Sequence, residues 1–180
     1  MSQCARPGIM MALTPIQEHL AVRIVKHVRE CNLGIVNIAA VNSSSQVVVS
    51  GQESAVEKVV EIAKSGELGS RIRKATQLRV NRAFHSDMLT EARETFQYCL
   101  QDSLHLCPGT DEKPVRVVSS VTGKLESISD EQTLRELLTR QITEPVLWYS
   151  ACSEIERMAV ETVVEVGGGG FNASNIPTSW

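Results

Sequence analysis

The spacing of hydrophobic residues changes several times along the first 80 positions, and each change marks an expected boundary between a strand and a helix. Short apolar runs between turn residues predict four strands, at residues 8–13, 35–41, 46–50 and 74–80. Two other stretches carry apolar residues three or four positions apart, which predicts amphipathic helices. The side chains expected to face inward are Ile16, Leu20, Ile24 and Val28 in the first helix and Val56, Val59, Val60 and Ala63 in the second.

These elements follow one another as β-α-β-β-α-β. That order predicts a ferredoxin-like arrangement, in which two helices pack on one face of an antiparallel sheet. A capping box is expected at the start of each helix, from Thr14 with Gln17 and from Ser50 with Glu53. The first helix is expected to stop at residues 31–34, where a glycine can adopt a left-handed conformation.

The second half of the chain predicts three helices but only two strands. Ser86 can cap a helix over residues 87–104, and the residues expected on its inner side are Met88, Leu89, Ala92, Phe96 and Leu100. The remaining expected elements are a strand at 115–119, a helix from Asp130 to about residue 142, a helix from Pro145 to about residue 158 and a strand at 162–166, with a loop at 107–113. Because two strands cannot cover three helices, we expect this half to belong to a larger α/β layer whose other strands are not in the sequence.

Composition and charge restrict the class of protein. The 180 residues are 42% hydrophobic and 22% charged, which is typical of a soluble globular protein. A net charge of −3 argues against a dedicated nucleic-acid binder, and no apolar run approaches the ~18 residues of a membrane helix. The five cysteines form no Cys-x-x-Cys pair, and the first residues lack the apolar region of a secretory signal. We therefore expect reduced thiols and an intracellular location, cytoplasmic or organellar.

A histidine at an expected strand-to-helix corner is the strongest candidate for chemistry. His85 follows the strand at 74–80, and an imidazole held at such a corner can act as a general base because it titrates near neutral pH. A structural histidine at a loop end is the alternative. The sequence has no Gly-x-Ser-x-Gly elbow and no metal-ligand spacing, and the glycines at 167–170 lack the Lys-Ser/Thr of a phosphate-binding loop.

Five motifs, taken in order, make the chain resemble the malonyl-CoA:acyl-carrier-protein transacylases. They are a hairpin ending in Gln-Val-Val-Val-Ser-Gly, then Val-Asn-Arg-Ala-Phe-His-Ser, Ser-Ser-Val-Thr-Gly, Gln-Ile-Thr-Glu-Pro-Val-Leu-Trp and Glu-Val-Gly, at residues 41–51, 80–86, 119–123, 141–148 and 165–167. The resemblance covers about residues 1–170. It implies a ferredoxin-like subdomain at 8–80, inserted into an α/β-hydrolase-like larger subdomain that includes 1–7 and 81–170, followed by an irregular tail at 171–180.

The resemblance also implies a reaction and its residues. The family transfers malonyl from coenzyme A to acyl carrier protein through a serine ester, and a histidine takes the proton of the serine. His85 matches that histidine, and Gln141 matches a glutamine whose side-chain oxygen orients the histidine ring, as the aspartate does in a triad. Phe84 falls where an aromatic ring narrows the acyl pocket, and Asn42 and Gln46 lie on a hairpin facing the substrate cleft. The implied partners are malonyl-CoA, as a substrate, and acyl carrier protein, with no cofactor and no metal.

The elbow serine, and the arginine that would bind the malonyl carboxylate, belong to a part of the family that the sequence does not match. We therefore expect the chain to be inactive alone. Three hypotheses follow: a shortened acyltransferase of fatty-acid synthesis, a non-catalytic module that binds carrier protein or coenzyme A, and an unrelated ferredoxin-like regulatory domain. The motifs of the second half favour the first. An incomplete larger subdomain also predicts exposed apolar surface and marginal stability.

Overall fold

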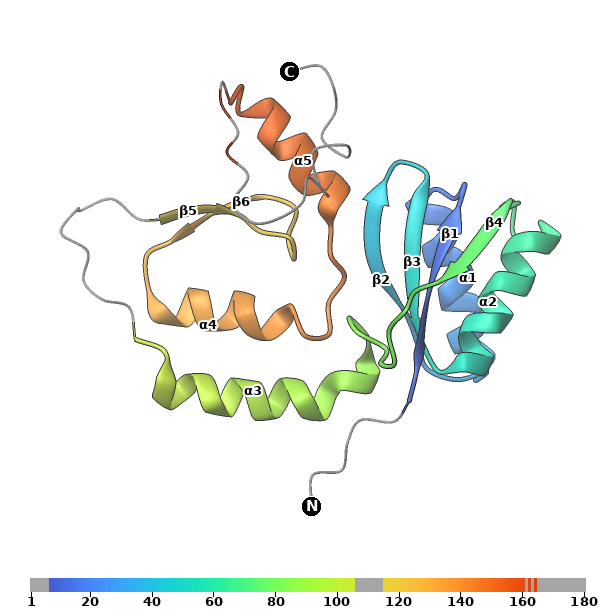
Figure 1. Cartoon of the computed structure of the whole chain (residues 1–180), viewed down its shortest axis with the longest axis horizontal. Helices are drawn as coiled ribbons and strands as arrows, with labels where there is room; N and C mark the ends of the chain where they lie inside the picture. Colours follow the sequence, from blue (N-terminus) through green and yellow to red (C-terminus); the bar gives the residue numbers. More distant parts are fainter. Residues whose placement is uncertain (1–6, 106–114, 161, 163, 165–180) are drawn as a thin grey trace.

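The structure is a computed structural model, and it describes residues 7–105, 115–160, 162 and 164. Its first half contains β1 (Ile9–Thr14), α1 (Glu18–Glu30), β2 (Val36–Ser43), β3 (Gln46–Gly51), α2 (Glu53–Ser65) and β4 (Lys74–Gln77). The strands form one antiparallel sheet in the order β2-β3-β1-β4, and both helices cover the same face of it (Figure 1). The predicted ferredoxin-like arrangement is confirmed.

The main core lies between this sheet and its two helices. Residues of β1 alternate between the two faces, so Leu13 joins the main core while Met10 joins a smaller cluster on the other face, with Ala39 and Val48. The inward-facing residues of the predicted helices lie in the main core: Ile16, Ile24, Val28, Val56, Val59 and Ala63 are buried, and Leu20 and Val60 are partly buried against them. The hydrophobic spacing therefore identifies the buried side of both helices.

The two predicted capping boxes are wrong. The residues before α1 and α2 are glutamines, and neither makes a side-chain capping bond. Thr14 and Ser50 cannot cap the helices because each belongs to a strand, Thr14 to the end of β1 and Ser50 to β3. The predicted end of the first helix is confirmed, since Cys31 is the C-cap of α1 and Gly34 has a φ of 124°.

The second half contains η1 (Asp87–Leu89), α3 (Thr90–Ser103), β5 (Val115–Val118), β6 (Leu125–Ile128), α4 (Glu131–Arg140) and α5 (Trp148–Arg157). Strand β6, which pairs antiparallel with β5, is absent from the prediction because four residues are too few to show a clear period. The predicted loop at 107–113 lies outside the described residues, as does most of the predicted strand at 162–166. Of that strand, the described Thr162 and Val164 belong to no regular element.

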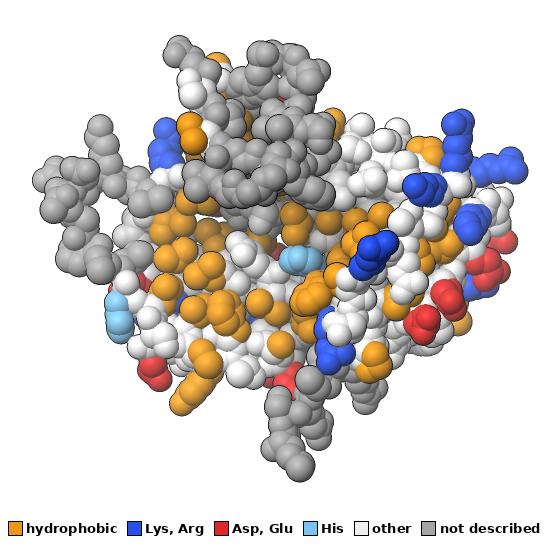
Figure 2. Space-filling model, viewed as in Figure 1, with side chains coloured by type: hydrophobic (Ala, Val, Ile, Leu, Met, Phe, Trp, Pro, Cys, Tyr) orange, Lys and Arg blue, Asp and Glu red, His pale blue; other side chains and the backbone are white. Residues whose placement is uncertain are grey.

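Helix α3 buries none of its 14 residues. Among the five residues predicted on the inner side of this region, only Leu89 is buried, while Ala92 is exposed and Met88, Phe96 and Leu100 are partly buried. Hydrophobic side chains gather on the face of the molecule over α3 and α4 (Figure 2). The predicted exposed apolar surface is therefore present, and marginal stability stays a prediction.

Asp130 caps α4, as predicted. Its Oδ1 accepts a hydrogen bond from the backbone N–H of Thr133 at 2.8 Å, and its Oδ2 accepts one from the Thr133 hydroxyl at 2.9 Å. These two bonds, the backbone one foremost, hold the pKa of the Asp130 carboxyl below its ordinary value. A carboxyl with a lowered folded-state pKa stabilises the fold at neutral pH, and this contribution is lost as the pH falls through that lowered pKa.

We expect Asp130→Ala to lower the melting temperature slightly at neutral pH. The effect should diminish as the pH falls below the ordinary pKa of an Asp carboxyl and through the lowered pKa of Asp130, where the wild-type side chain also loses its charge. Melting curves of both proteins between pH 7 and pH 3 measure this difference. Glu94→Ala, which removes an exposed acid on α3, serves as the control. If the difference in melting temperature between the two proteins stayed constant across the pH range, the charge of Asp130 would contribute nothing to stability.

The residues between α4 and α5 join the two halves of the chain. Val146 forms a parallel bridge with Ala40 at the edge of β2. Its N–H donates to the carbonyl of Ala39 at 2.9 Å, and its carbonyl accepts from the N–H of Val41 at 2.9 Å. Because this pairing holds the segment against β2, α5 begins at Trp148 and not at the predicted Pro145.

Candidate active site

His85 lies at a sharp corner between β4 and η1. Its φ of 57° is in the left-handed region, which residues other than glycine seldom adopt. The next residue, Ser86, is fully buried; its hydroxyl donates to the carbonyl of Ala83 at 2.6 Å and accepts from a backbone N–H of η1 at 3.3 Å. The N–H of Asp87 donates to the side-chain oxygen of Asn37 on β2 at 3.1 Å. These bonds fix the point from which the His85 side chain leaves the backbone.

The ring of His85 has a defined hydrogen-bond partner. Its Nδ1 lies 3.0 Å from the main-chain carbonyl oxygen of Glu144. A carbonyl oxygen can only accept, so the hydrogen of the neutral ring must lie on Nδ1. The other nitrogen, Nε2, then carries the lone pair, and a half-buried imidazole in this tautomer is arranged to take a proton from a neighbouring group.

The acceptor that orients His85 differs from the predicted one. Gln141 follows the last residue of α4; its N–H donates to the carbonyl of Leu137 at 3.2 Å, and the residue is exposed. No hydrogen bond joins its side chain to His85 within the described part of the chain. The predicted acceptor was a side chain, whereas the observed acceptor is a backbone carbonyl, which every residue has. Pro145 predicts an extended backbone at Glu144, but nothing in the sequence shows that this carbonyl faces His85.

Asn42 and Gln46 lie together on the β2-β3 hairpin, as predicted from the sequence. The Asn42 Nδ2 donates to the Gln46 Oε1 at 3.0 Å, and the Gln46 Nε2 donates to the hydroxyl of Thr14 at 3.4 Å. Asn42 directly follows Val41, which pairs with Val146. Asn42 therefore stands beside the part of β2 that holds the segment after Glu144, and Gln46 lies next to it at the start of β3. Their role toward a substrate stays a prediction.

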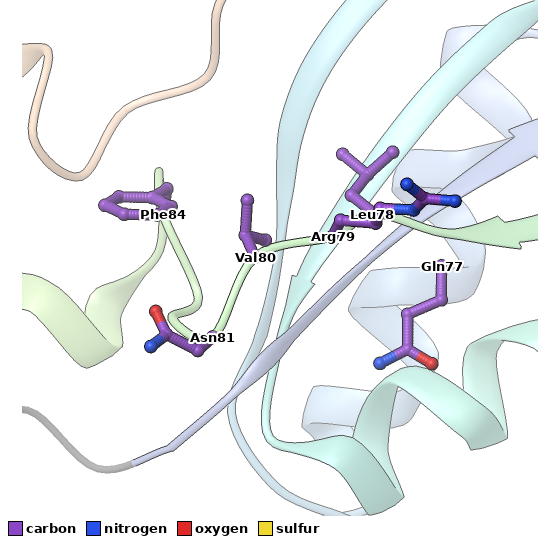
Figure 3. Close-up of a pocket in the computed structure, with 6 residues that line it drawn as sticks. All are labelled: Gln77, Leu78, Arg79, Val80, Asn81 and Phe84. Carbon is purple, nitrogen blue, oxygen red and sulfur yellow. The ribbon is translucent and has the colours of Figure 1, made fainter.

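Phe84 is 44% exposed and lines an open hollow of about 750 Å³. The other lining residues all come from the stretch that leaves β4 and runs to the corner: Gln77, Leu78, Arg79, Val80 and Asn81 (Figure 3). All the described residues that line the hollow belong to this one stretch of chain, and the hollow is otherwise open. It leaves Phe84, the neighbour of His85 in the chain, free to contact a bound molecule.

The described residues offer His85 no hydroxyl or thiol partner by hydrogen bonding. Of the thiols, that of Cys152 has its pKa raised, first by burial and then by Glu156, which makes it a poor nucleophile. Within the described ranges there is no group of three His, Cys, Asp or Glu residues that could hold a metal ion. Among the same residues, no helix is both long and apolar enough to cross a membrane. Among the described residues, His85 therefore has no nucleophile within hydrogen-bonding contact.

Comparison with known proteins gives a consistent set of relatives. The chain is 28% identical over 165 residues to the malonyl CoA-acyl carrier protein transacylase of Bacillus subtilis, covering 92% of this chain and 48% of that protein. It is 34% identical over 137 residues to the polyketide synthase GfsA of Streptomyces halstedii, covering 76% of this chain and 2% of that protein. No family model matches the chain.

A solved structure supports the same relationship. The chain superposes on the malonyl CoA-acyl carrier protein transacylase of Clostridium perfringens with a TM-score of 0.77 and 29% identity, covering 96% of this chain and 50% of that one. The mixed α/β fold predicted from the sequence is thereby confirmed. The chain spans about half the length of each of these two transacylases.

Proposed function

From its membership of the malonyl CoA-acyl carrier protein transacylase family over the part that it spans, we propose that this chain supplies the general base of a malonyl transfer from coenzyme A to acyl carrier protein. The observation that carries the proposal is the 3.0 Å contact between His85 Nδ1 and the Glu144 carbonyl oxygen, which leaves Nε2 as the proton acceptor. The relatives include a polyketide synthase, so the malonyl units would serve either fatty-acid or polyketide synthesis.

In the proposed reaction, a serine from a segment outside this sequence attacks the malonyl thioester. Nε2 of His85 takes the serine proton, and the resulting imidazolium returns that proton to the departing thiolate of coenzyme A. In the second half-reaction, Nε2 takes the proton of the pantetheine thiol on the carrier protein as its sulfur attacks the malonyl-serine ester. The imidazolium then gives the proton back to the serine oxygen, so that both enzyme groups are regenerated.

The other predicted residues have supporting roles in this proposal. Phe84 is exposed beside His85, and its ring would restrict the space next to the reacting carbonyl. Asn42 donates a hydrogen bond to Gln46, and Gln46 donates one to Thr14 at the end of β1. They would shape the same side of the cleft. Because the described part holds no partner hydroxyl for His85, we propose that the chain alone transfers no malonyl.

A basic stretch beside the hollow supports the two proposed partners. Residues 68–86 contain no Asp or Glu, and their five cations are Arg71, Arg73, Lys74, Arg79 and Arg82. Arg71 and Arg73 lie just before the edge strand β4, Lys74 begins it, and Arg79 and Arg82 lie on the stretch that leads to His85. Lys and Arg side chains gather in this region in Figure 2. Coenzyme A and the prosthetic arm of a carrier protein both place phosphate groups beside pantetheine. Cations in this position would attract those phosphates.

We expect Arg79→Glu to weaken binding of coenzyme A by roughly tenfold, the equivalent of about 1.4 kcal/mol. Isothermal titration with coenzyme A at low and at high salt measures the effect, which should shrink as salt screens it. Lys64→Glu on α2 introduces the same change of charge away from the hollow and is the control. If the two variants bound coenzyme A with equal affinity, the basic stretch would not contribute to its binding.

Replacing His85 and measuring both binding and malonyl transfer separates catalysis from simple binding. A non-catalytic module for coenzyme A or carrier protein is the second candidate, and the absence of a nucleophile partner among the described residues favours it. That candidate requires that the chain alone binds coenzyme A or carrier protein, and that replacing His85 leaves this affinity unchanged. The base proposal requires His85 for transfer.

A further inference from the structure

The side chain of Glu144 is held in a fork by Arg140. The Arg140 Nε donates to Glu144 Oε1 at 2.9 Å, and the Arg140 Nη2 donates to Glu144 Oε2 at 2.9 Å. Both side chains are largely shielded from solvent, at 29% and 32% exposed. Glu136, on the other side of Arg140, stands farther off at 3.9 Å. A two-bond fork between guanidinium and carboxylate fixes orientation as well as distance.

The fork acts on the one residue whose carbonyl holds His85. Glu144 lies just beyond the end of α4, and its N–H donates to the carbonyl of Arg140 at 2.9 Å. Arg140 therefore contacts Glu144 in two ways, through a backbone hydrogen bond and through the side-chain fork. On the far side, Pro145 restricts the backbone of Glu144, and Val146 is pinned to β2. The peptide that carries the Glu144 carbonyl is thus fixed at both ends.

A second guanidinium supports the same segment. Arg93 of α3 donates from Nη1 to the hydroxyl of Thr143 at 3.2 Å. Thr143 is 9% exposed and directly precedes Glu144. Because the segment is tied to α3, α4 and β2 together, a movement of its carbonyl would need more than one of these contacts to break.

We propose that Arg140 is a positioning residue for His85. By clamping Glu144, Arg140 aims the Glu144 carbonyl at Nδ1 and so selects the ring tautomer in which Nε2 is free to take a proton. This inference rests on the proposed function of His85. Arg140 makes no hydrogen bond to the His85 ring among the described residues, so it acts through Glu144.

The test is the tautomer of His85, read from ¹⁵N–¹H spectra of the histidine-labelled chain at pH 9, above the range in which imidazoles ordinarily titrate. In the wild-type chain the ring should be in the Nδ1–H form. In Arg140→Ala, the ratio of Nδ1–H to Nε2–H should fall by about threefold or more, as expected for a weakened hydrogen bond. Glu144→Gln, which keeps the main-chain carbonyl but loses the charged partner, should cause a smaller shift in the same direction.

Two further variants make the test specific. Glu136→Gln removes the distant carboxylate and should leave the spectrum unchanged. Arg140→Lys keeps the positive charge but cannot form the two-bond fork, so its ratio of Nδ1–H to Nε2–H should lie between those of Arg140→Ala and the wild type. Arg140→Ala and Glu144→Gln with wild-type spectra would overturn the role of Arg140. A wild-type ring in the Nε2–H form would instead overturn the proposed function, so the two failures are distinguishable. If Arg140→Ala does not fold, Glu144→Gln and Arg140→Lys carry the test.

Discussion

Replacing His85 by alanine is expected to slow malonyl transfer by about 10³-fold or more, once the chain is paired with a segment that supplies the nucleophile. The physical reason is the loss of Nε2, the one nitrogen of the ring that the Glu144 carbonyl leaves unprotonated. Without it, neither the serine hydroxyl nor the pantetheine thiol has an acceptor for its proton. Both half-reactions should therefore slow.

The pairing can be made with the half of the Bacillus subtilis transacylase that this chain does not match, produced as a separate polypeptide. Transfer of labelled malonyl from coenzyme A to carrier protein is then measured for each half alone and for the mixture. His27→Ala, on the exposed side of α1, is the matched control and should transfer at the wild-type rate. If the His85→Ala mixture kept pace with the control, His85 would not be the base.

Gly51→Ala is expected to destabilise the fold by about 3 kcal/mol or more. A Cβ at this position would stand 2.2 Å from the carbonyl oxygen of Ile35 and 2.7 Å from the Cα of Val36. Both are backbone atoms, so neither can swing away as a side chain can. Gly51 pairs with Ile9 on one side and Val36 on the other, and β3 would have to move away from β2.

The neighbouring residue provides a contrasting control. Ser50 is fully buried, and its hydroxyl has no hydrogen-bond partner among the described residues. Ser50→Ala should therefore be neutral or slightly stabilising, because it removes a buried polar group that has no partner. Urea unfolding of the two variants and the wild type gives the comparison. Equal midpoints for Gly51→Ala and Ser50→Ala would refute the backbone contact as the reason for a glycine in this hairpin.

The first half of the fold could be predicted because both of its helices bury a clear apolar face. The repeats in α1 and α2 identify the helical side of the core, whereas residues 9–13 of β1 are all apolar and only the structure separates its two faces. The capping boxes failed for a different reason. Thr14 and Ser50 are good caps in isolation, but the sheet uses both of them as strand residues, and tertiary pairing overrides a local preference.

The corner position of His85 was predictable from the sequence, and the partner that orients its ring was not. His85 stands out from its corner and its motif, and Ser86 caps η1 as the sequence indicates. The orienting group is the carbonyl of Glu144, and no residue type marks which carbonyl will face a ring. The Arg140–Glu144 fork has the spacing of an ordinary helix-surface ion pair, so only its place beside His85 in three dimensions reveals a role.

The ring tautomer of His85 in the wild-type chain tests the central claim most directly, because it needs neither a nucleophile nor a substrate. We predict that ¹⁵N–¹H spectra place the hydrogen of the neutral ring on Nδ1, with Nε2 bare and open to solvent or substrate. A ring found with its hydrogen on Nε2 would contradict the account, since such an imidazole could not accept the proton of a serine or a thiol at that atom.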